Sequence, residues 1–323
     1  MTQVGRIVRS VLRGVAVTCV VAGAGLFALQ IHRHSAVAEQ REPSPRATSN
    51  TSARGANFAD PELVSAFLGG AASDIAAVTT YDYRTLPDAL NAGLAVTTGA
   101  YRAAYRAALT GDVGRTAIAQ HAVHTFEMLN IGIGEMNAAG TRAKVLVFGR
   151  QSVTDDLTNG QTQTSPVTLC ATIRRDGDLF RISDLVEGAN AGLPPGGPDL
   201  RVAAEAGRSE VANLLSYRRA DFDVDLQRAV AGATSPLSEE IQNNAADTRA
   251  AMTTGQYDLT GTVTAIAVVS ASANAVTLLV TADATRIPDG SAEPVITHPR
   301  YVVAVIRTPL GWATSRVTPV DGT

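Results

Sequence analysis

The sequence predicts an α+β protein: an N-terminal transmembrane helix followed by two tandem domains of one architecture. Three observations predict this. An uncharged apolar segment stands near the N-terminus, a pattern of large apolar residues recurs at a constant spacing, and each copy changes from helical to strand periodicity along the chain. A chain of 323 residues has room for about two domains of ordinary size.

The apolar segment Gly14–Ile31 is 18 residues long and carries no charge. At about 1.5 Å rise per residue it would span roughly 27 Å, close to the hydrocarbon thickness of a bilayer. Arg6, Arg9 and Arg13 precede it, so the positive-inside rule predicts a cytoplasmic tail at residues 1–13. The protein is therefore expected in the cell membrane as a single-pass protein, with everything after the helix outside the cytoplasm.

Two other interpretations of this segment stay open. Ala36–Ala38 resembles the cleavage site of a signal peptide, although the charged stretch His32–His34 separates it from the apolar core. A lipoprotein signal at Cys19 fits poorly, because the apolar run continues past the cysteine. All three interpretations deliver the body of the protein to the outside of the cytoplasm.

Two polar segments predict the domain boundaries. Residues 32–57 are rich in Pro, Ser and Thr and lack periodicity, which is typical of a disordered, flexible tether. Residues 187–199 gather Gly and Pro between the two copies, as linkers do. The predicted domains are residues 58–186 and residues 200–320.

The recurring pattern compares residues 76–105 with residues 212–241. The aligned pairs are Tyr81 and Tyr217, Leu86 and Phe222, Leu90 and Leu226, Tyr101 and Leu237, and Tyr105 and Ile241. The separation of Tyr81 from Tyr217, here called the repeat spacing, is the same in every pair. Large apolar positions persist while polar positions differ. Such a pattern indicates a shared packing scaffold rather than a shared catalytic site.

Periodicity and turn residues predict the elements of each copy. In copy one, helices are expected at residues 60–81, 86–94 and 98–111, and strands at residues 121–136 and 141–154 and on both sides of the turn 176–178. In copy two, helices are expected at residues 200–217, 222–231 and 235–253, and strands at residues 257–270, 275–285, 295–307 and 312–317. Three helices followed by a curled four-stranded antiparallel sheet is the order of an NTF2-like cone.

Copy one also resembles a known family. Residues Tyr81–Leu86 (YDYRTL), the strand Val145–Phe148 and the closing segment Phe180–Leu185 are similar to those of actinobacterial Mce-associated membrane proteins. The resemblance covers about Gly14–Glu187. It implies a membrane helix with an extracytoplasmic NTF2-like domain, and a non-enzymatic accessory or scaffold role in an Mce complex that imports lipids.

The second copy is a departure from that family, in which a single domain is commoner. Two tandem NTF2-like domains behind one membrane helix resemble the VirB8-like conjugation proteins of Gram-positive plasmids. The partners implied by the two resemblances are the membrane, through residues 14–31, and subunits of an envelope transport or secretion complex. A homo-oligomer is left open.

The aromatic residues Tyr81, Tyr101, Tyr105 and Phe126 are candidates for the lining of a pocket for a hydrophobic small molecule. They could equally form the ordinary core of a domain that has few Phe and Trp residues. Candidate acid and base groups are His121, His124, Glu127 and Asp155 in copy one, and Asp258, Asp283 and His298 in copy two. We expect these to be surface or junction residues, because strand periodicity separates His121 from His124 onto opposite faces. No catalytic residue, cofactor or metal site is therefore predicted.

The charge distribution excludes a nucleic-acid-binding protein. Residues 1–57 contain seven arginines and two acids, and the remainder contains 20 basic and 28 acidic residues. A mildly acidic body lacks the clustered cations that nucleic acids require. Cys19 and Cys170 are the two cysteines, too few for a structural zinc site.

Overall fold

The computed structural model describes residues 61–320 except residues 138, 189–197 and 291–292. The predicted tail, transmembrane helix and tether lie outside the described residues, as does most of the predicted linker. In the part that is described, no helix is both long enough and apolar enough to cross a membrane. The chain divides into two compact units, here called the first unit (residues 61–188) and the second unit (residues 198–320).

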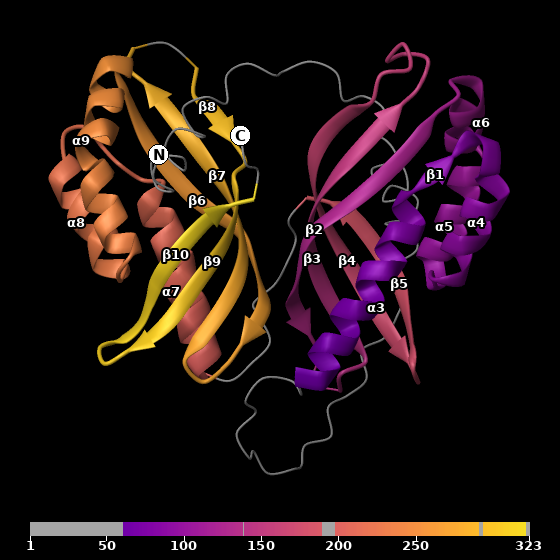
Figure 1. The fold of residues 1–323 in the computed structure, drawn as a ribbon, viewed down its shortest axis with the longest axis horizontal. Helices are drawn as coiled ribbons and strands as arrows, with labels where there is room; N and C mark the ends of the chain where they lie inside the picture. The colour runs from indigo at the N-terminus through magenta and orange to yellow at the C-terminus, as the bar shows by residue number, and fades with distance from the viewer. Residues whose placement is uncertain (1–60, 138, 189–197, 291–292, 321–323) are drawn as a thin grey trace. The chain divides into compact units, whose positions relative to one another are not determined.

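The first unit places its helices before an antiparallel sheet (Figure 1). Its helices are α3 (Pro61–Thr79), the short 3₁₀ helix η1 (Tyr83–Thr85), α4 (Leu86–Ala95), α5 (Gly99–Thr110) and α6 (Asp112–Ala119). Its strands are β1 (Tyr81–Asp82), β2 (Val123–Met136), β3 (Arg142–Thr154), β4 (Gln163–Asp176) and β5 (Leu179–Glu187). Strands β2, β3, β4 and β5 pair in that order, each antiparallel to the next, and β1 pairs with β2.

The second unit follows the same general order (Figure 1). Its helices are α7 (Pro198–Leu214), α8 (Phe222–Gly232) and α9 (Leu237–Gly255). Its strands are β6 (Tyr257–Ala271), β7 (Ala275–Pro288), β8 (Val295–Thr297), β9 (Arg300–Thr308) and β10 (Gly311–Pro319). Strands β6, β7, β9 and β10 pair in that order, all antiparallel, and β8 pairs with the end of β7. The predicted α+β class and the order of helices before an antiparallel sheet are confirmed.

The prediction of three helices in the first copy is wrong, because the described part of the first unit contains four α-helices. Gly111 ends α5, where its N–H donates to the carbonyl of Ala108. Asp112 then lies in the first turn of α6, where a negative charge is favoured by the helix dipole. The eight residues of α6 are too few to give a clear apolar period in the sequence.

The prediction of one strand at residues 295–307 is also wrong. The structure divides this segment into β8 and β9 at His298 and Pro299. Proline has no N–H to give to a strand ladder, so a break is expected there. The carbonyl of Pro299 instead accepts a hydrogen bond from the N–H of Ala282.

The first helix of each unit packs one face on its sheet. On α3 the buried positions are Val64, Phe67, Ala71, Asp74, Ile75, Val78 and Thr79. On α7 and the residue after it they are Leu200, Ala203, Ala204, Gly207, Glu210, Val211, Leu214 and Leu215. Steps of three and four residues place these side chains along one stripe, which is the pattern of a helix that covers a sheet.

Bulges curl both sheets. The register of β2 against β3 shifts between Met128 and Asn130 and again between Ile133 and Glu135. The register of β6 against β7 shifts between Val263 and Ala265 and again between Val268 and Ser270. Because a bulge bends its strand and increases the local twist, these shifts account for the curl. The number of helices differs between the described units, and their origin by duplication stays a prediction.

Candidate functional site

Two of the four candidate pocket aromatics are packed in the core of the first unit. Tyr101 and Tyr105 on α5 are each 1% exposed, and their ring centroids lie 6.5 Å apart. The hydroxyl of Tyr105 donates to the carbonyl of Ala89 on α4 at 3.2 Å. Its ring lies against Gly93, where a β-carbon would overlap the ring atoms. Burial raises the pKa of both tyrosines, so both remain neutral phenols.

The other two candidate aromatics lie on β1 and β2. Tyr81 stacks on the imidazole of His124 with ring centroids 5.3 Å apart. Phe126, two residues further along β2, packs over Gly149 of the neighbouring strand, where a β-carbon would overlap the ring. Both aromatics are only partly buried. The structure therefore brings together Tyr101 with Tyr105, and Tyr81 with His124.

The acid and base candidates of the first unit each make a local contact. His121 precedes β2 in the left-handed region (φ 50°), and its Nδ1 lies 2.8 Å from Oδ2 of Asp156. Asp155 accepts a hydrogen bond from the N–H of Thr158 at 2.8 Å. Glu127 forms a cross-strand ion pair of 3.6 Å with Arg150. These three candidates support turns and strand pairing.

His124 differs from the other candidates because it is buried. Its Nδ1 lies 2.5 Å from the carbonyl oxygen of Thr79 at the end of α3, so an Nδ1–H donor fits this contact. Burial lowers the pKa of His124, against smaller opposite effects of the Thr79 carbonyl and the Gln151 side chain. The neutral imidazole fastens the end of α3 to β2, which is a structural role.

The candidates of the second unit lie at two places. His298 and Asp283 form an exposed pair, with Nδ1 and Oδ1 2.8 Å apart. Asp258 accepts hydrogen bonds from the backbone N–H of Arg219 at 3.0 Å and from its Nε at 3.2 Å. Within the described residues, no group of three or more His, Cys, Asp or Glu side chains could hold a metal ion.

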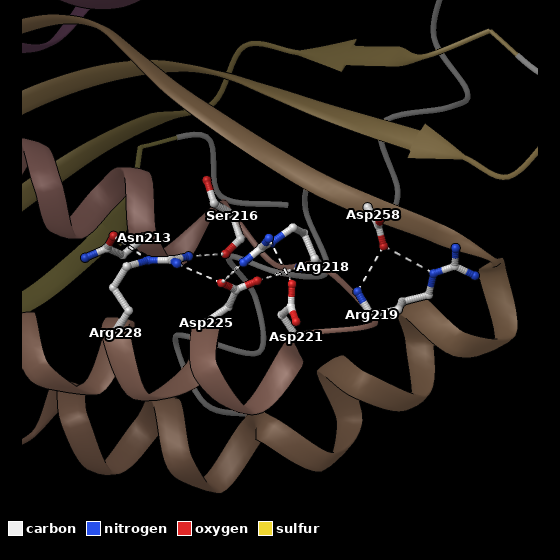
Figure 2. A network of polar contacts seen from close by, with 8 residues as sticks. All are labelled: Asn213, Ser216, Arg218, Arg219, Asp221, Asp225, Arg228 and Asp258. Carbon is white, nitrogen blue, oxygen red and sulfur yellow. Dashed lines mark hydrogen bonds and ion pairs between the residues drawn. The ribbon is translucent and has the colours of Figure 1, made fainter.

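Figure 2 shows a polar network in the second unit that the sequence did not reveal. Its centre is Asp225 in the first turn of α8, whose side chain is 1% exposed. The carboxylate accepts from the backbone N–H of Arg218 at 2.8 Å, from Nη2 of Arg218 at 3.3 Å and from Nη1 of Arg228 at 2.7 Å. Burial alone would raise the pKa of Asp225, but the hydrogen bonds from both arginines outweigh it and lower the pKa.

The same network fastens the loop between α7 and α8 to its surroundings. Arg228 also donates to Oδ1 of Asn213 at 3.1 Å and to the carbonyl of Ser216 at 3.0 Å. Arg219 joins the loop to Asp258 on β6 and to Asp289 after β7 (Figure 2 shows the Asp258 contacts). Each of these arginines is paired with carboxylates or carbonyls, so the network is a structural junction.

Two further acidic residues are buried and have carboxylate oxygens without a hydrogen-bond partner among the described residues. Asp74 on α3 is 8% exposed and Glu210 on α7 is 0% exposed. Among the described residues, Oδ2 of Asp74 and both carboxylate oxygens of Glu210 have no hydrogen-bond partner. Burial raises the pKa of Asp74 to about 6, against a smaller lowering by Arg181. Burial raises the pKa of Glu210 to about 8, against a smaller lowering by the amide of Asn213.

The sequence did contain a signal for these acids. Asp74 and Glu210 are separated by the repeat spacing, and each stands two positions before its stretch of the recurring pattern. The observation that polar positions differ between the copies therefore does not extend to this position. Only the structure reveals that both acids lie on the buried stripe of their helix.

No protein-family model and no curated protein sequence matches the chain. Among solved structures, it is similar to an IcmL-like type IV secretion system protein from Legionella pneumophila (9% identity, 40% of this chain, 98% of that chain, TM-score 0.33). It is similar to CagV, a VirB8 homolog from Helicobacter pylori (11% identity, 38% and 98%, TM-score 0.33). It is also similar to an NTF2-like protein involved in plasmid conjugation (9% identity, 81% and 100%, TM-score 0.28). At these TM-scores the similarities carry no conclusion about what this chain does.

Proposed function

We propose that the protein is a non-enzymatic, membrane-anchored scaffold of a cell-envelope complex. One observation carries this proposal. The acid and base candidates are divided between the two units, and each is engaged in a local hydrogen bond or ion pair. A catalytic site requires an acid and a base that converge on one substrate position. Polar groups used in this way instead support a rigid surface on which other proteins can dock.

The complex we favour is a VirB8-like conjugation or type IV secretion machine. The described chain forms two compact units, each with helices before an antiparallel sheet. Two such domains behind one membrane helix is the layout that the VirB8-like resemblance implies, whereas a single domain is commoner among Mce-associated proteins. An accessory role in Mce-type lipid import is the second candidate, favoured by the similarity of the segment Tyr81–Leu86.

We further propose that the two units are copies of one NTF2-like unit. In the first unit the N–H of Thr98 donates to the carbonyl of Ile182 at 2.9 Å. One repeat spacing after Thr98, the N–H of Thr234 donates to the carbonyl of Thr314 at 2.8 Å. Both shifts of register in β2 also have counterparts in β6, at a spacing that differs from the repeat spacing by a single position.

The last strands also support a common origin. In β5 the bulged residue is Ser183, whose hydroxyl donates to the carbonyl of Thr172 at 3.2 Å. In β10 the bulged residue is Ser315, whose hydroxyl donates to the carbonyl of Ala304 at the same distance. Irregular contacts of this kind are not required by any sheet, so their recurrence favours duplication over convergence.

The test of the scaffold proposal is co-purification. We would tag the full-length protein, extract it from native membranes in mild detergent and identify associated proteins and lipids by mass spectrometry. A matched control is the same tagged chain without residues 198–320, which separates the contribution of the second unit. A tagged, unrelated single-pass protein gives the background.

Recovery of conjugation ATPase or channel subunits would support the favoured complex. Recovery of Mce lipid-transport subunits would support the second candidate. Recovery of the protein alone, with a bound lipid or sterol-like molecule, would contradict the scaffold proposal and favour an NTF2-like pocket for a hydrophobic ligand.

A further inference from the structure

The first helices of the two units match at seven positions of their buried stripes; the additional buried residue of α7, Ala204, corresponds to the half-buried Leu68. The pairs separated by the repeat spacing are Val64 and Leu200, Phe67 and Ala203, Ala71 and Gly207, Asp74 and Glu210, Ile75 and Val211, Val78 and Leu214, and Thr79 and Leu215, and all are buried. Most of these pairs are small or apolar on both helices. The acidic pair is the exception, and burial of carboxylate oxygens that lack a hydrogen-bond partner among the described residues is costly.

Glu210 lies at a junction of three elements. Its carboxylate packs against Gly232 at the end of α8, where a β-carbon would overlap Oε2. The next residue, Ala233, forms a parallel bridge with Thr314 of β10. Oγ1 of Thr314 is also buried without a partner among the described residues. The carboxyl group therefore lies against the end of α8, one residue before the bridge that joins this end to β10, and α7 packs on both elements.

The surroundings of Glu210 offer one polar group that stabilises a negative charge, the side-chain amide of Asn213 one turn later on α7, and its effect is smaller than that of burial. Gly207, one turn earlier on α7, faces Leu278, Val303 and Val305 of the sheet. On β10 the buried residues of this region, Thr314 and Val317, are uncharged. The titratable and charged groups of the neighbouring loop and of α8 are Tyr217, Arg218, Arg219, Asp221, Asp223, Asp225 and Arg228. Tyr217 interacts electrostatically with Glu210. Arg218 and Arg228 are already bound to Asp225, and Arg219 to Asp258 and Asp289.

Asp74 has one neighbour that Glu210 lacks. Arg181 on β5, two positions before the bulged Ser183, attracts the negative charge of Asp74. The residue two positions before the bulged Ser315 of β10 is the uncharged Ala313. The two acids thus share a position but differ in how strongly burial favours the protonated form.

We propose that Asp74 and Glu210 are a matched pair of proton-binding positions, one in each unit, and that loss of the proton from Glu210 loosens the junction between α7, α8 and β10. A protonated carboxyl group is uncharged, and its O–H can donate to a nearby carbonyl or hydroxyl oxygen. The ionised group can only accept, and it brings a charge into an apolar site. The second unit therefore responds at higher pH than the first unit.

The sign of the effect follows from proton linkage. In the unfolded chain a glutamate has a pKa of about 4.3. Between that value and the folded value, the folded second unit holds one proton that the unfolded chain has released. Stability therefore falls as pH rises, and the equilibrium constant of unfolding rises by about tenfold per pH unit. Above the folded pKa, which burial raises to about 8, this dependence ends.

The test is urea unfolding of the full-length protein in detergent micelles at several pH values. Trp312 is the single tryptophan and lies on β10, so its fluorescence reports on the second unit. The variant Glu210→Gln keeps the shape of the protonated acid without a titratable group. The matched control is Glu205→Gln, the same change at an exposed position of α7. Glu210→Met serves if the glutamine variant does not fold.

Between about pH 6 and pH 8, we expect the unfolding constant of the wild type to rise roughly 50-fold relative to that of Glu210→Gln. The ratio of the unfolding constant of the wild type to that of Glu205→Gln is expected to stay constant over the same pH range. Hydrogen exchange of α7 and the end of α8 should accelerate over the same range in the wild type, with α9 as the internal control. A constant ratio between wild type and Glu210→Gln would overturn the proposal.

Asp74→Asn tests the first unit by hydrogen exchange of the α3 segment. The opening constant of the wild type relative to this variant is expected to rise between about pH 4 and pH 6 and to be flat above pH 7, because burial raises the pKa of Asp74 only to about 6. Asp88→Asn, at an exposed position of α4, is the control. If the ratio of the opening constants continued to rise above pH 7, or did not change with pH, the proposal that Asp74 is a proton-binding position matched to Glu210 would be contradicted.

Discussion

At the residue scale, two helical glycines differ in how much space surrounds them. Gly93 on α4 lies under the ring of Tyr105, while Gly69 on α3 has nothing within 4 Å of the place where a β-carbon would stand. The sequence offers no means to distinguish these two helical glycines. Their difference depends on contacts between elements, which local periodicity does not encode.

We therefore predict opposite effects for the same substitution. Gly93→Ala should lower the free energy of unfolding by about 1–3 kcal/mol, since the added methyl overlaps the Tyr105 ring and forces it to move. Gly69→Ala should raise the free energy of unfolding by up to about 1 kcal/mol, since alanine is the better helix former and space is available. Urea unfolding followed by circular dichroism measures both. Equal changes in the free energy of unfolding would show that the Tyr105 ring can move aside without loss of stability.

At the element scale, most helices and strands could be predicted from the sequence and the junctions could not. Helices α5 and α8 and the long strands lie within a few residues of their expected ranges, because each has a clear period. The loop after α7 is different: Arg219 bonds Asp258 and Asp289, which are 39 and 70 residues away. Nothing in a local window predicts such pairs, so the network around Asp225 was missed.

Asp225 is the member of that network whose loss should matter most. Asp225→Ala should lower the free energy of unfolding of the second unit by about 2–4 kcal/mol, because it removes a buried acceptor shared by two arginines. Asp221→Ala is the matched control: it removes an exposed partner of Arg218 and should cost less than about 1 kcal/mol. Trp312 fluorescence during urea unfolding measures both. Similar losses would mean that burial adds nothing to this contact.

The pH dependence contributed by Asp225 has the opposite sign from that of Glu210. Its folded pKa lies below the ordinary value, because hydrogen bonds from Arg218 and Arg228 outweigh the effect of burial. The stabilisation is present above the unfolded pKa of about 3.9 and is lost as pH falls through the folded pKa. Relative to Asp225→Ala, the wild type should therefore lose stability on acidification below about pH 4. An acid titration of both proteins, followed by Trp312 fluorescence, measures the difference between their free energies of unfolding. A difference that stays constant on acidification would contradict this assignment.

At the scale of the whole molecule, the fold class could be predicted because helical and strand periods follow one another in the same order twice along the chain. The burial of Asp74 and Glu210 could not be predicted, since acidic residues on a helix are normally solvent-exposed. Asp74 and Glu210 emerge only when the buried stripe is known and the repeat spacing is applied to it. For the candidate pocket aromatics, the sequence left core packing and ligand lining open. The structure places Tyr101 and Tyr105 against each other in the core.

Two compact units should each fold separately. We predict that residues 58–188 and residues 198–320, expressed as independent fragments, each unfold cooperatively in urea. Each first helix buries its apolar stripe within its own unit, so neither fragment loses the main contacts of that helix. Circular dichroism and exchange-resistant amides measure the outcome. A fragment that unfolds without a cooperative transition would show that the units depend on each other.

The approach of Glu210 to Gly232 has a further consequence for how the chain can vary. One repeat spacing before Gly232 stands Val96, and the acid that corresponds to Glu210 is the shorter Asp74. The second unit thus has the longer acid, Glu210, and a glycine at position 232. The first unit has the shorter acid, Asp74, and the branched Val96 at the corresponding position. A side chain at position 232 would overlap the Glu210 carboxylate, so Gly232→Val should be tolerated far better together with the shortening substitution Glu210→Asp than alone.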